Sequence, residues 1–400
     1  MSSHTRSRTV LISGASIAGP ALAYWLDRHG FDVTLVEKAP RLRGGGYPVD
    51  IRGTAMDVVD RMGLVPRLRK AHVDTRRLSF VDDAGATIAA VAPAELTAGV
   101  TEDDLEIPRG ELADGLYELI RDRVEILFSD SIASLTEHPG HVDVLLRSGA
   151  RRSVDLVVGA DGLHSHTRGL VLGPEEQYHH YIGYCFAGFT LPARADLSRE
   201  AVVWNAPGRA AVLYATAPGA PVHGFLAFRR DEPPFAAFRD PAAQRDLVAD
   251  TFAGDPWEVR GLLAAMREAD DLFFDVVSQI RLPAWHRGRV ALVGDAAHAP
   301  SFLSGQGSSL ALVGAYVLAG ELATRPDHTA AFTAYEAALR GFVRSNQDYA
   351  TTGGAALLPR TAEELARRNE ALTNPVPARP AGADRALTTT VELPDYPGAR

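Results

Sequence analysis

The stretch TVLISGASIAGPALAYWLDRHGFDVTLVE, residues 9–37, decides the fold class. Its first five residues form an apolar run that predicts a buried strand, and the turn Gly14-x-Ser16-x-x-Gly19 follows. Apolar residues at helical spacing over 20–29 then predict a helix, and 31–36 predict a second strand. This order is a βαβ unit. We therefore expect an α/β protein with a Rossmann-type dinucleotide-binding domain.

The turn between the first strand and the helix nearly fits the dinucleotide fingerprint G-x-G-x-x-G. Gly14 permits the tight turn, Gly19 permits close packing of helix on strand, and the helix N-terminus offers N–H groups to a pyrophosphate. Ser16 replaces the middle glycine. Glu37 ends the second strand, where a carboxylate can hold the ribose hydroxyls of FAD or of NAD. A plain α/β turn without a ligand is the alternative interpretation.

In two further segments, a glycine and an aspartate follow the end of a predicted apolar strand. Residues 155–168 read DLVVGADGLHSHTR, and residues 289–307 read RVALVGDAAHAPSFLSGQG. Ligands bind at the carboxyl ends of strands in open α/β sheets. Both segments are therefore candidates for the same binding site as the first turn.

In order and in sequence, the three segments resemble the signatures of the FAD-dependent aromatic hydroxylases. This is the single-component class that includes p-hydroxybenzoate hydroxylase and the tetracycline-inactivating monooxygenases. Their Asp-Gly-x-x-Ser-x-x-Arg pattern is matched at Asp161, Gly162, Ser165 and Arg168, and their Gly-Asp-Ala-Ala-His pattern at 294–298. The resemblance covers about residues 9–345.

The resemblance implies FAD as the cofactor and NADPH or NADH as a transient reductant. Asp295 would hold the ribityl chain, and the helix that starts near Gly305 would turn its positive end to the flavin pyrimidine. The implied cofactor-binding residues are Gly14, Ser16, Ile17, Ala18, Gly19, Glu37, Lys38, Arg43, Arg52, Arg109, Ile132, Asp161, Gly162, Asp295, Pro300, Gly305, Gln306, Gly307 and Ser308.

The chain departs from the family pattern before the last glycine pair. Ser301 and Phe302 stand where relatives usually carry two prolines, and Ser309 stands where asparagine is usual. We expect Ser301 and Phe302 to line the pocket. No side chain is assigned the catalytic step, because the flavin carries it. His298 is expected to be structural.

The pattern along the chain predicts a β-rich lobe inserted into the α/β body. Strand-like segments dominate 178–281, with one clear helix at 241–252, and 78–90 resembles a hairpin. Phe186, Tyr214 and Phe225 are the candidate substrate contacts in this lobe.

The tail 374–400, rich in proline, is expected to be irregular or disordered. The expected division is a discontinuous FAD-binding domain of 1–75, 100–177 and 282–348, a substrate domain of 76–99 and 178–281, and a C-terminal helix and tail of 349–400.

The resemblance implies a monooxygenase that hydroxylates an aromatic or polycyclic small molecule with O₂ through a flavin C4a-hydroperoxide. Baeyer–Villiger oxygenation on the same scaffold stays open, and so does a redox-silent FAD-containing cyclase or binding protein. A halogenase is disfavoured because its Trp-x-Trp-x-Ile-Pro motif is absent. An NAD-dependent dehydrogenase is disfavoured by the second and third signatures.

Composition narrows the partners and the location. The 400 residues carry a formal net charge of −9, which argues against nonspecific binding to nucleic acid or anionic membranes. The single cysteine, Cys185, excludes an intrachain disulfide, and no Cys/His cluster has zinc spacing. No run approaches the roughly 20 apolar residues that a membrane helix needs. We expect a cytoplasmic monomer or homodimer without a metal.

Overall fold

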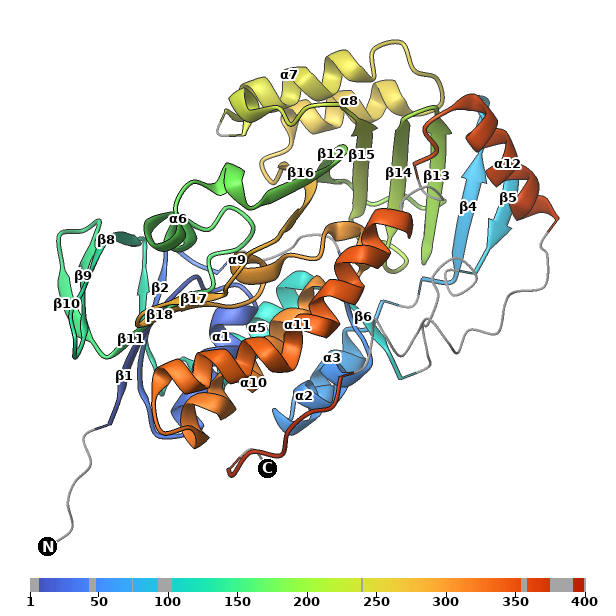
Figure 1. The fold of residues 1–400 in the computed structure, drawn as a ribbon. Helices are drawn as coiled ribbons and strands as arrows, with labels where there is room; N and C mark the ends of the chain where they lie inside the picture. The colour runs from blue at the N-terminus through green and yellow to red at the C-terminus, as the bar shows by residue number, and fades with distance from the viewer. Residues whose placement is uncertain are drawn as a thin grey trace, which may run out of the picture.

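The computed structural model describes residues 7–42, 48–73, 75–92, 103–238, 240–353, 358–374 and 391–398. Arg43, one of the expected cofactor contacts, lies outside these residues. Within them the chain forms a mixed α/β fold with a mainly parallel sheet at one end and a large, mainly antiparallel sheet at the other (Figure 1).

The first sheet places the ends of its parallel strands along one edge. Its strands run in the spatial order β17-β18-β11-β1-β2-β7, and β1 pairs in parallel with β2 and with β11, which pairs in parallel with β18. The carboxyl ends of β1, β2, β11 and β18 therefore meet at one edge, where ligands bind in such sheets. The bounds are β1 (Thr9–Ser13), β2 (Asp32–Glu37), β7 (Glu125–Phe128), β11 (Leu156–Gly159), β17 (His286–Arg287) and β18 (Val290–Leu292).

The helices on this sheet form the main hydrophobic core. The helix α10 packs against α1, and the Trp25 ring of α1 meets the edge of Tyr316 on α10 at 5.1 Å. By length and composition α10 could cross a membrane, but 78% of it is buried in this core, which explains its apolar sequence. The bounds are α1 (Ala18–Arg28), α2 (Thr54–Arg61), α3 (Val65–Lys70), α5 (Arg109–Ile120), α6 (His166–Leu172), α9 (Asp295–His298), α10 (Gly307–Thr324) and α11 (His328–Gly353).

The large antiparallel sheet forms the expected β-rich lobe. Its strands run in the order β16-β12-β15-β14-β13-β4-β5, so the hairpin β4–β5 from early in the chain extends the sheet of the later strands. The bounds are β4 (Arg77–Val81), β5 (Thr87–Val91), β12 (His179–Leu191), β13 (Glu200–Ala206), β14 (Arg209–Ala215), β15 (Val222–Arg229) and β16 (Phe273–Ile280).

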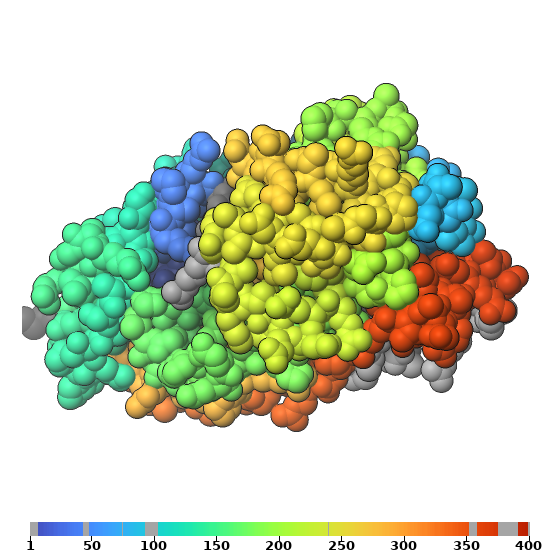
Figure 2. All heavy atoms as spheres, turned by 90° about the horizontal axis from the view of Figure 1, so that it is seen from above, coloured from blue at the N-terminus to red at the C-terminus, as the bar shows by residue number. Residues whose placement is uncertain are grey.

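Two helices cover one face of this sheet, α7 (Pro241–Thr251) and α8 (Val259–Glu268), drawn in yellow and orange in Figures 1 and 2. The sequence indicated only the first, so the expectation of one helix was wrong. In α8, Gly261 lowers the intrinsic helix propensity. The helix forms because Val259, Leu262 and Met266 share one side and are buried against the sheet.

Two smaller sheets complete the described residues. The ribbon β3 (Pro48–Ile51) pairs with β6 (Leu105–Pro108), and the outer sheet consists of β8 (Ile132–Glu137), β9 (Val142–Leu146) and β10 (Arg151–Val154). The ribbon contacts α10, whereas the outer sheet lies at the far end of the molecule from the β-rich lobe (Figure 1).

The C-terminal region is more ordered than the sequence suggested. The helix α12 (Ala362–Thr373) lies beside β5 (Figure 2). Residues 391–398 have no regular structure, as expected, yet the expectation of disorder was wrong for them, because they pack on the core. Tyr396 is buried and donates a hydrogen bond of 2.8 Å to Glu321. A Cβ on Gly320 would lie 2.1 Å from the Tyr396 ring, so this glycine makes the docking possible.

Candidate cofactor and substrate site

The turn after β1 has the geometry that the fingerprint predicts. Gly14 has φ +108°, and a Cβ there would lie 2.5 Å from the carbonyl oxygen of Ala160. A Cβ on Gly19 would lie 1.9 Å from the carbonyl oxygen of Gly14. Both positions therefore admit only glycine, the first for its backbone conformation and for the close approach to the end of β11, the second for helix packing.

Ser16, at the position of the missing middle glycine, binds an arginine. The Arg109 guanidinium donates a 2.7 Å hydrogen bond to its Oγ, so the first residue of α5 lies beside the turn. The helix α1 begins just after Ser16 with no side-chain cap on its N-terminus. An uncapped helix N-terminus beside a guanidinium favours an anion, as a pyrophosphate would require.

Glu37 ends β2 and is tied to the same turn. One carboxylate oxygen accepts the N–H of Ala15 at 2.8 Å, and the other accepts the N–H of Ala39 at 2.9 Å. Each carboxylate oxygen has a further lone pair, so Glu37 can accept additional hydrogen bonds from a ligand. Lys38, the next residue, is exposed.

Asp161, in the second signature, directs its carboxylate into its own loop. One oxygen accepts the hydroxyl of Ser165 at 2.5 Å, and the other accepts the N–H and the hydroxyl of Thr167, both at 2.9 Å. Ser165 in turn caps α6 by accepting the N–H of Arg168 at 2.9 Å. Asp161 and Ser165 therefore fix the loop, and the backbone around Gly162 (φ +83°) is left to meet a ligand.

The signature arginine joins the second and third signatures. Arg168 is completely buried and donates hydrogen bonds to the carbonyls of Ala296 at 3.1 Å and Leu163 at 2.8 Å. Its charge is balanced by Glu175 at 2.7 Å. The loops at the ends of β11 and β18 are consequently held in one arrangement.

Asp295 is exposed within a buried run. Gly294, Ala296 and Ala297 around it are buried, yet the Asp295 side chain is accessible to solvent. The surrounding protein nevertheless desolvates the carboxyl, and together with the nearby charge of Asp275 this raises the pKa of Asp295 to about 6, against the opposing charges of Arg109 and Arg168. The carboxylate therefore borders accessible space inside the molecule, as a ligand contact should.

The segment Gly305–Gly307 lies between Asp295 and the β3–β6 ribbon. A Cβ on Gly307 would lie 3.9 Å from the Asp295 Oδ1, and one on Gly305 would lie 3.2 Å from the Asp50 Oδ2 and 3.6 Å from a guanidinium nitrogen of Arg52. The fold therefore brings Asp295, Arg52 and the start of α10 close to one another, as expected.

Ser309, one departure from the family pattern, ties α10 to the ribbon. Its Oγ accepts the N–H of Arg52 at 3.1 Å and donates to the carbonyl of Asp50 at 3.4 Å. The Ser309 side chain thus links α10 to β3. This role was not apparent from the sequence, because it depends on a partner far away in the chain.

The backbone at Ser301 and Phe302 has a conformation that two prolines could not adopt. Ser301 has φ +89°, which the proline ring forbids. Phe302 is 47% exposed, and its ring stacks on Phe186 of β12 with centroids 5.2 Å apart. The loop before Gly305 therefore presents an aromatic ring toward the β-rich lobe. The adjacent Pro300 is buried, and its carbonyl accepts a hydrogen bond from Gln279.

The three candidate substrate contacts share one face of the large sheet. In the register, Phe186 is opposite Ala227, Phe225 is opposite Gly188 and Val212, and Tyr214 is opposite His223. These positions alternate with Trp204 and Phe228, which are buried in the cluster beneath α7 and α8. The face of Phe186, Tyr214 and Phe225 is therefore the one that α7 and α8 leave uncovered, and Phe302 contacts it.

One expected cofactor contact has its side chain in the core, and one residue that the sequence did not single out lies on the β3–β6 ribbon. Ile132, an expected cofactor contact, has its side chain buried in a hydrophobic cluster with Leu11 and Val36, so only its backbone could meet a ligand. Glu106, which the sequence did not single out, lies on the ribbon opposite Asp50. An isolated glutamate on a short strand carries no motif, so no sequence signal pointed to it.

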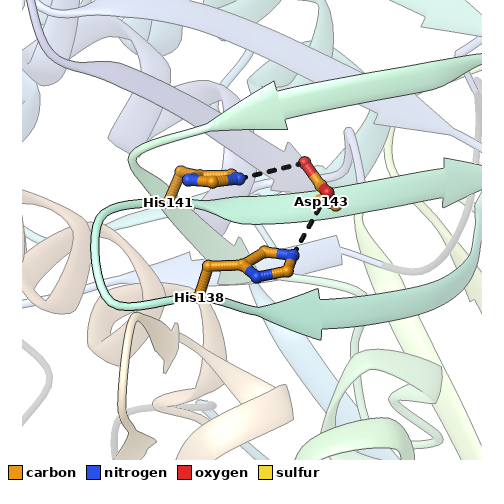
Figure 3. A group of neighbouring side chains, drawn as sticks. All are labelled: His138, His141 and Asp143. Atoms are coloured by element: carbon orange, nitrogen blue, oxygen red, sulfur yellow. Dashed lines mark ion pairs between the residues drawn. The ribbon is translucent and has the colours of Figure 1, made fainter.

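A separate group of polar side chains lies on the outer hairpin. Figure 3 shows the His138 and His141 rings one above the other, both turned toward Asp143, with Nε2-to-oxygen distances of 3.2 and 3.4 Å. Their ligand atoms lie within 4.8 Å of one another, a spacing at which one cation could bind. The group is at the end of the molecule away from the β-rich lobe, so it is not part of the candidate site.

The residues at the strand ends fit FAD. The uncapped N-terminus of α1 and the Arg109 guanidinium can bind a pyrophosphate, and the exposed carboxylate of Asp295 can accept hydrogen bonds from ribityl hydroxyls. Gln306 adds a buried Oε1 atom that accepts no hydrogen bond among the described residues. Such an atom is costly unless a bound donor satisfies it.

Comparison with known proteins supports this assignment. A model of the FAD binding domain family matches residues 7–199 and 274–338. A prokaryotic protein described as a flavin-dependent monooxygenase is 37% identical over 98% of this chain and 100% of its own length.

Solved structures show the same fold. The crystal structure of the tetracycline destructase Tet(55) has 36% sequence identity, covers 98% of this chain and 100% of its own, and superposes with a TM-score of 0.84. HpxO of Klebsiella pneumoniae, solved with FAD and uric acid, covers 92% of this chain and 93% of its own, with a TM-score of 0.72 and 22% identity, which indicates a shared fold only.

Proposed function

Because this chain belongs to the flavin-dependent monooxygenases that carry an FAD-binding domain, we propose that it uses NADPH or NADH and O₂ to hydroxylate an aromatic or polycyclic small molecule. The observation that carries the proposal is the position of Asp295 and Gly305–Gly307 beside accessible space, with the aromatic face of the large sheet nearby.

When bound and reduced, FAD supplies the activation of O₂. The chain supplies binding and orientation. Glu37 would hold the adenosine ribose, Arg109 and the α1 N-terminus the pyrophosphate, and Asp295 the ribityl hydroxyls. The N-terminus of α10 would stabilise negative charge on the flavin pyrimidine.

The substrate would lie against Phe186, Phe225 and Tyr214. Phe186 is on β12 and Tyr214 on β14, with β15 between them, so the two strands are about 10 Å apart. A flat, largely apolar face of this width suits a fused ring system. Phe302 stacked on Phe186 would close one side of the space and exclude water from the reacting atoms.

The nicotinamide is expected to bind transiently across the same space. Among the described residues we find no second glycine turn between a strand and a helix with the geometry of Gly14–Gly19. The proposed reductant would therefore bind beside Asp295 and Gly305–Gly307 instead of on a domain of its own.

The test is steady-state oxidation of NADPH and of NADH by the purified FAD-loaded protein, with and without phenols and polycyclic polyketides. Stimulation by at least one ring substrate, with product formed, is expected. A ketone converted to an ester would identify Baeyer–Villiger chemistry instead. Protein that retains FAD but oxidises neither nucleotide with any substrate would contradict the proposal and favour the redox-silent alternative.

A further inference from the structure

The β3–β6 ribbon has a polar face that is turned into the molecule. Asp50 is directly opposite Glu106 in the antiparallel register. Strand alternation buries Leu105 and Ile107 in the main core and places Glu106 on the other face. That face meets the turn before α10 on one side, through Asp50 and Gly305, and the large sheet on the other.

Glu106 is bound by two hydroxyl groups, one from the segment that leads into β4 and one from the large sheet. Thr75 donates to one carboxylate oxygen at 3.2 Å, and Tyr214 of β14 donates to the other at 3.4 Å. The hydroxyls of Thr75 and Tyr214 are themselves 3.2 Å apart. This closed set of hydrogen bonds joins the ribbon to the sheet face proposed to hold the substrate.

The surroundings of Glu106 bring its titration close to neutral pH. Burial and the facing charge of Asp50 raise the pKa of Glu106 to about 7, while Arg52 and the hydrogen bonds from Thr75 and Tyr214 oppose the rise. Burial likewise raises the pKa of Asp50, and the charge of Asp104 adds to it.

Two titratable groups lie on the sheet side of this carboxyl: Tyr214, and His223, whose ring is 6.2 Å from the Tyr214 ring and whose pKa is lowered by burial. Burial raises the pKa of Tyr214, so its phenol stays protonated and can donate. Arg52 is paired with Asp50 at 2.7 Å. His72 contacts the backbone of Glu106, its Nδ1 lying 3.2 Å from the Glu106 nitrogen, and not the carboxylate.

We propose that Glu106 accepts the proton of an acidic hydroxyl on the substrate, with Tyr214 and Thr75 orienting its carboxylate, so that the ring reacts as a phenolate or enolate. This inference rests on the proposed function and names its substrate class, phenols and enols. The substrate O–H bond breaks, its electron pair stays on the substrate oxygen, and a new O–H bond forms on Glu106. The proton leaves to solvent or to product before the next turnover.

The position of Glu106 supports this role. It lies between the glycine turn before α10 and the aromatic face, so a ring on that face could bring a hydroxyl to it. A phenolate is more electron-rich than a phenol and reacts faster with an electrophilic oxygen. A carboxyl that titrates near the working pH is the most effective base for such a transfer.

The first experiment measures binding and needs no turnover. Alizarin, a dihydroxyanthraquinone whose colour changes on ionisation, is titrated into the FAD-loaded wild type and the Glu106→Gln variant near pH 7, where part of Glu106 is ionised and can accept a proton. A larger share of the bound alizarin should be in the ionised, red form in wild type than in Glu106→Gln. Glu111→Gln, on the exposed first turn of α5, should behave as wild type. Identical spectra of bound alizarin in wild type and Glu106→Gln would overturn the proposal.

The second experiment uses the pH profile of alizarin-dependent NAD(P)H oxidation. In wild type kcat/KM should rise with pH through about 7 and then level off. Glu106→Gln should lose this limb and about 10²-fold in kcat/KM, the usual contribution of one general base. Asp50→Asn should move the limb to lower pH, because it removes the repulsion that raises the Glu106 pKa.

These outcomes separate the two proposals. A purely structural Glu106 would lower the Tm of the variant but leave the colour of bound alizarin and the pH limb in place, which would overturn the inference and spare the proposed function. Bound ionised alizarin in a protein that oxygenates nothing would overturn the proposed function and support the assignment of Glu106.

Discussion

Arg168 donates a hydrogen bond of 3.1 Å to the carbonyl oxygen of Ala296, so the second and third signatures are tied together by one completely buried guanidinium. Arg168 also donates to the carbonyl of Leu163 and pairs with Glu175. The signature arginine therefore links the two loops.

Replacing this arginine should therefore destabilise the fold. Arg168→Met removes the fully buried partner of an ion pair, leaves two carbonyls without their donor and leaves Glu175 with His164 as its remaining partner, which costs about 3–5 kcal/mol. Urea denaturation followed by circular dichroism measures the loss. Arg287→Met, which removes an exposed arginine bound to one carbonyl, is the control. If Arg168→Met lost no more unfolding free energy than the control, the Arg168 link between the two loops would not stabilise the fold.

Replacing Asp161 should mainly lower the stability of the fold, whereas replacing Asp295 should mainly weaken FAD binding. Asp161→Ala removes the acceptor of three loop hydrogen bonds, so it should lower stability, whereas the affinity for FAD should change little. Asp295→Ala should weaken FAD binding by about 1.5–3 kcal/mol per lost charge-assisted hydrogen bond, or roughly 10- to 100-fold. Burial raises the pKa of Asp295 to about 6, so the apoprotein should not lose stability on its removal.

Measuring both quantities in both variants decides the matter. Fluorescence titration gives the FAD dissociation constant, and thermal unfolding of apoprotein gives stability. If Asp161→Ala weakened FAD binding more than Asp295→Ala, the roles assigned to the two carboxylates would be reversed.

Phe302 should control the coupling of NAD(P)H oxidation to product. Its half-exposed ring stacks on Phe186, so Phe302→Ala opens the space near Gly305 to water. FAD should remain bound and reducible, but more H₂O₂ should form per NAD(P)H consumed. Phe235→Ala, which removes another exposed phenylalanine on the far side of the lobe's strands, is the matched control. Unchanged coupling would place Phe302 outside the reacting site.

His298 should affect stability at low pH and not catalysis. It is buried between Trp285 and Tyr335, and burial, aided by the charge of Arg340, lowers its pKa to about 3. A histidine that is neutral when folded contributes stability that is present above the unfolded pKa of about 6.5 and is lost as pH falls toward 3.

The comparison of wild type with His298→Asn isolates this group. Between pH 7 and pH 5, wild type should lose about 2 kcal/mol of unfolding free energy relative to the variant. Urea titrations at both pH values measure it, and other titrating groups cancel in the difference. A difference between the two proteins that stays constant with pH would show that His298 has the same pKa in the folded and unfolded states.

Local signals explain what the sequence could predict. The strand, turn and helix around Gly14 are fixed by neighbours in the chain, and the structure has them at nearly the expected bounds. The signatures at Asp161 and Asp295 likewise follow short strands whose parallel pairing brings their ends together. A run of strand-like segments predicted a β-rich lobe, and Phe186, Tyr214 and Phe225 share the face of its sheet that lies opposite α7 and α8.

The remaining features depend on contacts between distant residues. Glu106 gains its unusual setting only when β3 pairs with β6 and Tyr214 approaches from the other lobe. Tyr396 docks because Gly320 leaves space on α10. The loop at Ser301 has a positive φ that no neighbouring residue signals. Tertiary packing decides each of these.

The most direct test of the central claim is a mass spectrum of product formed under ¹⁸O₂. FAD-loaded protein is supplied with NADPH or NADH and the ring substrate that best stimulates its oxidation. The account predicts one ¹⁸O atom in each hydroxylated product, and none when the label is in water instead. Product that takes its oxygen from water, or substrate that returns unchanged while NAD(P)H is consumed, would contradict it.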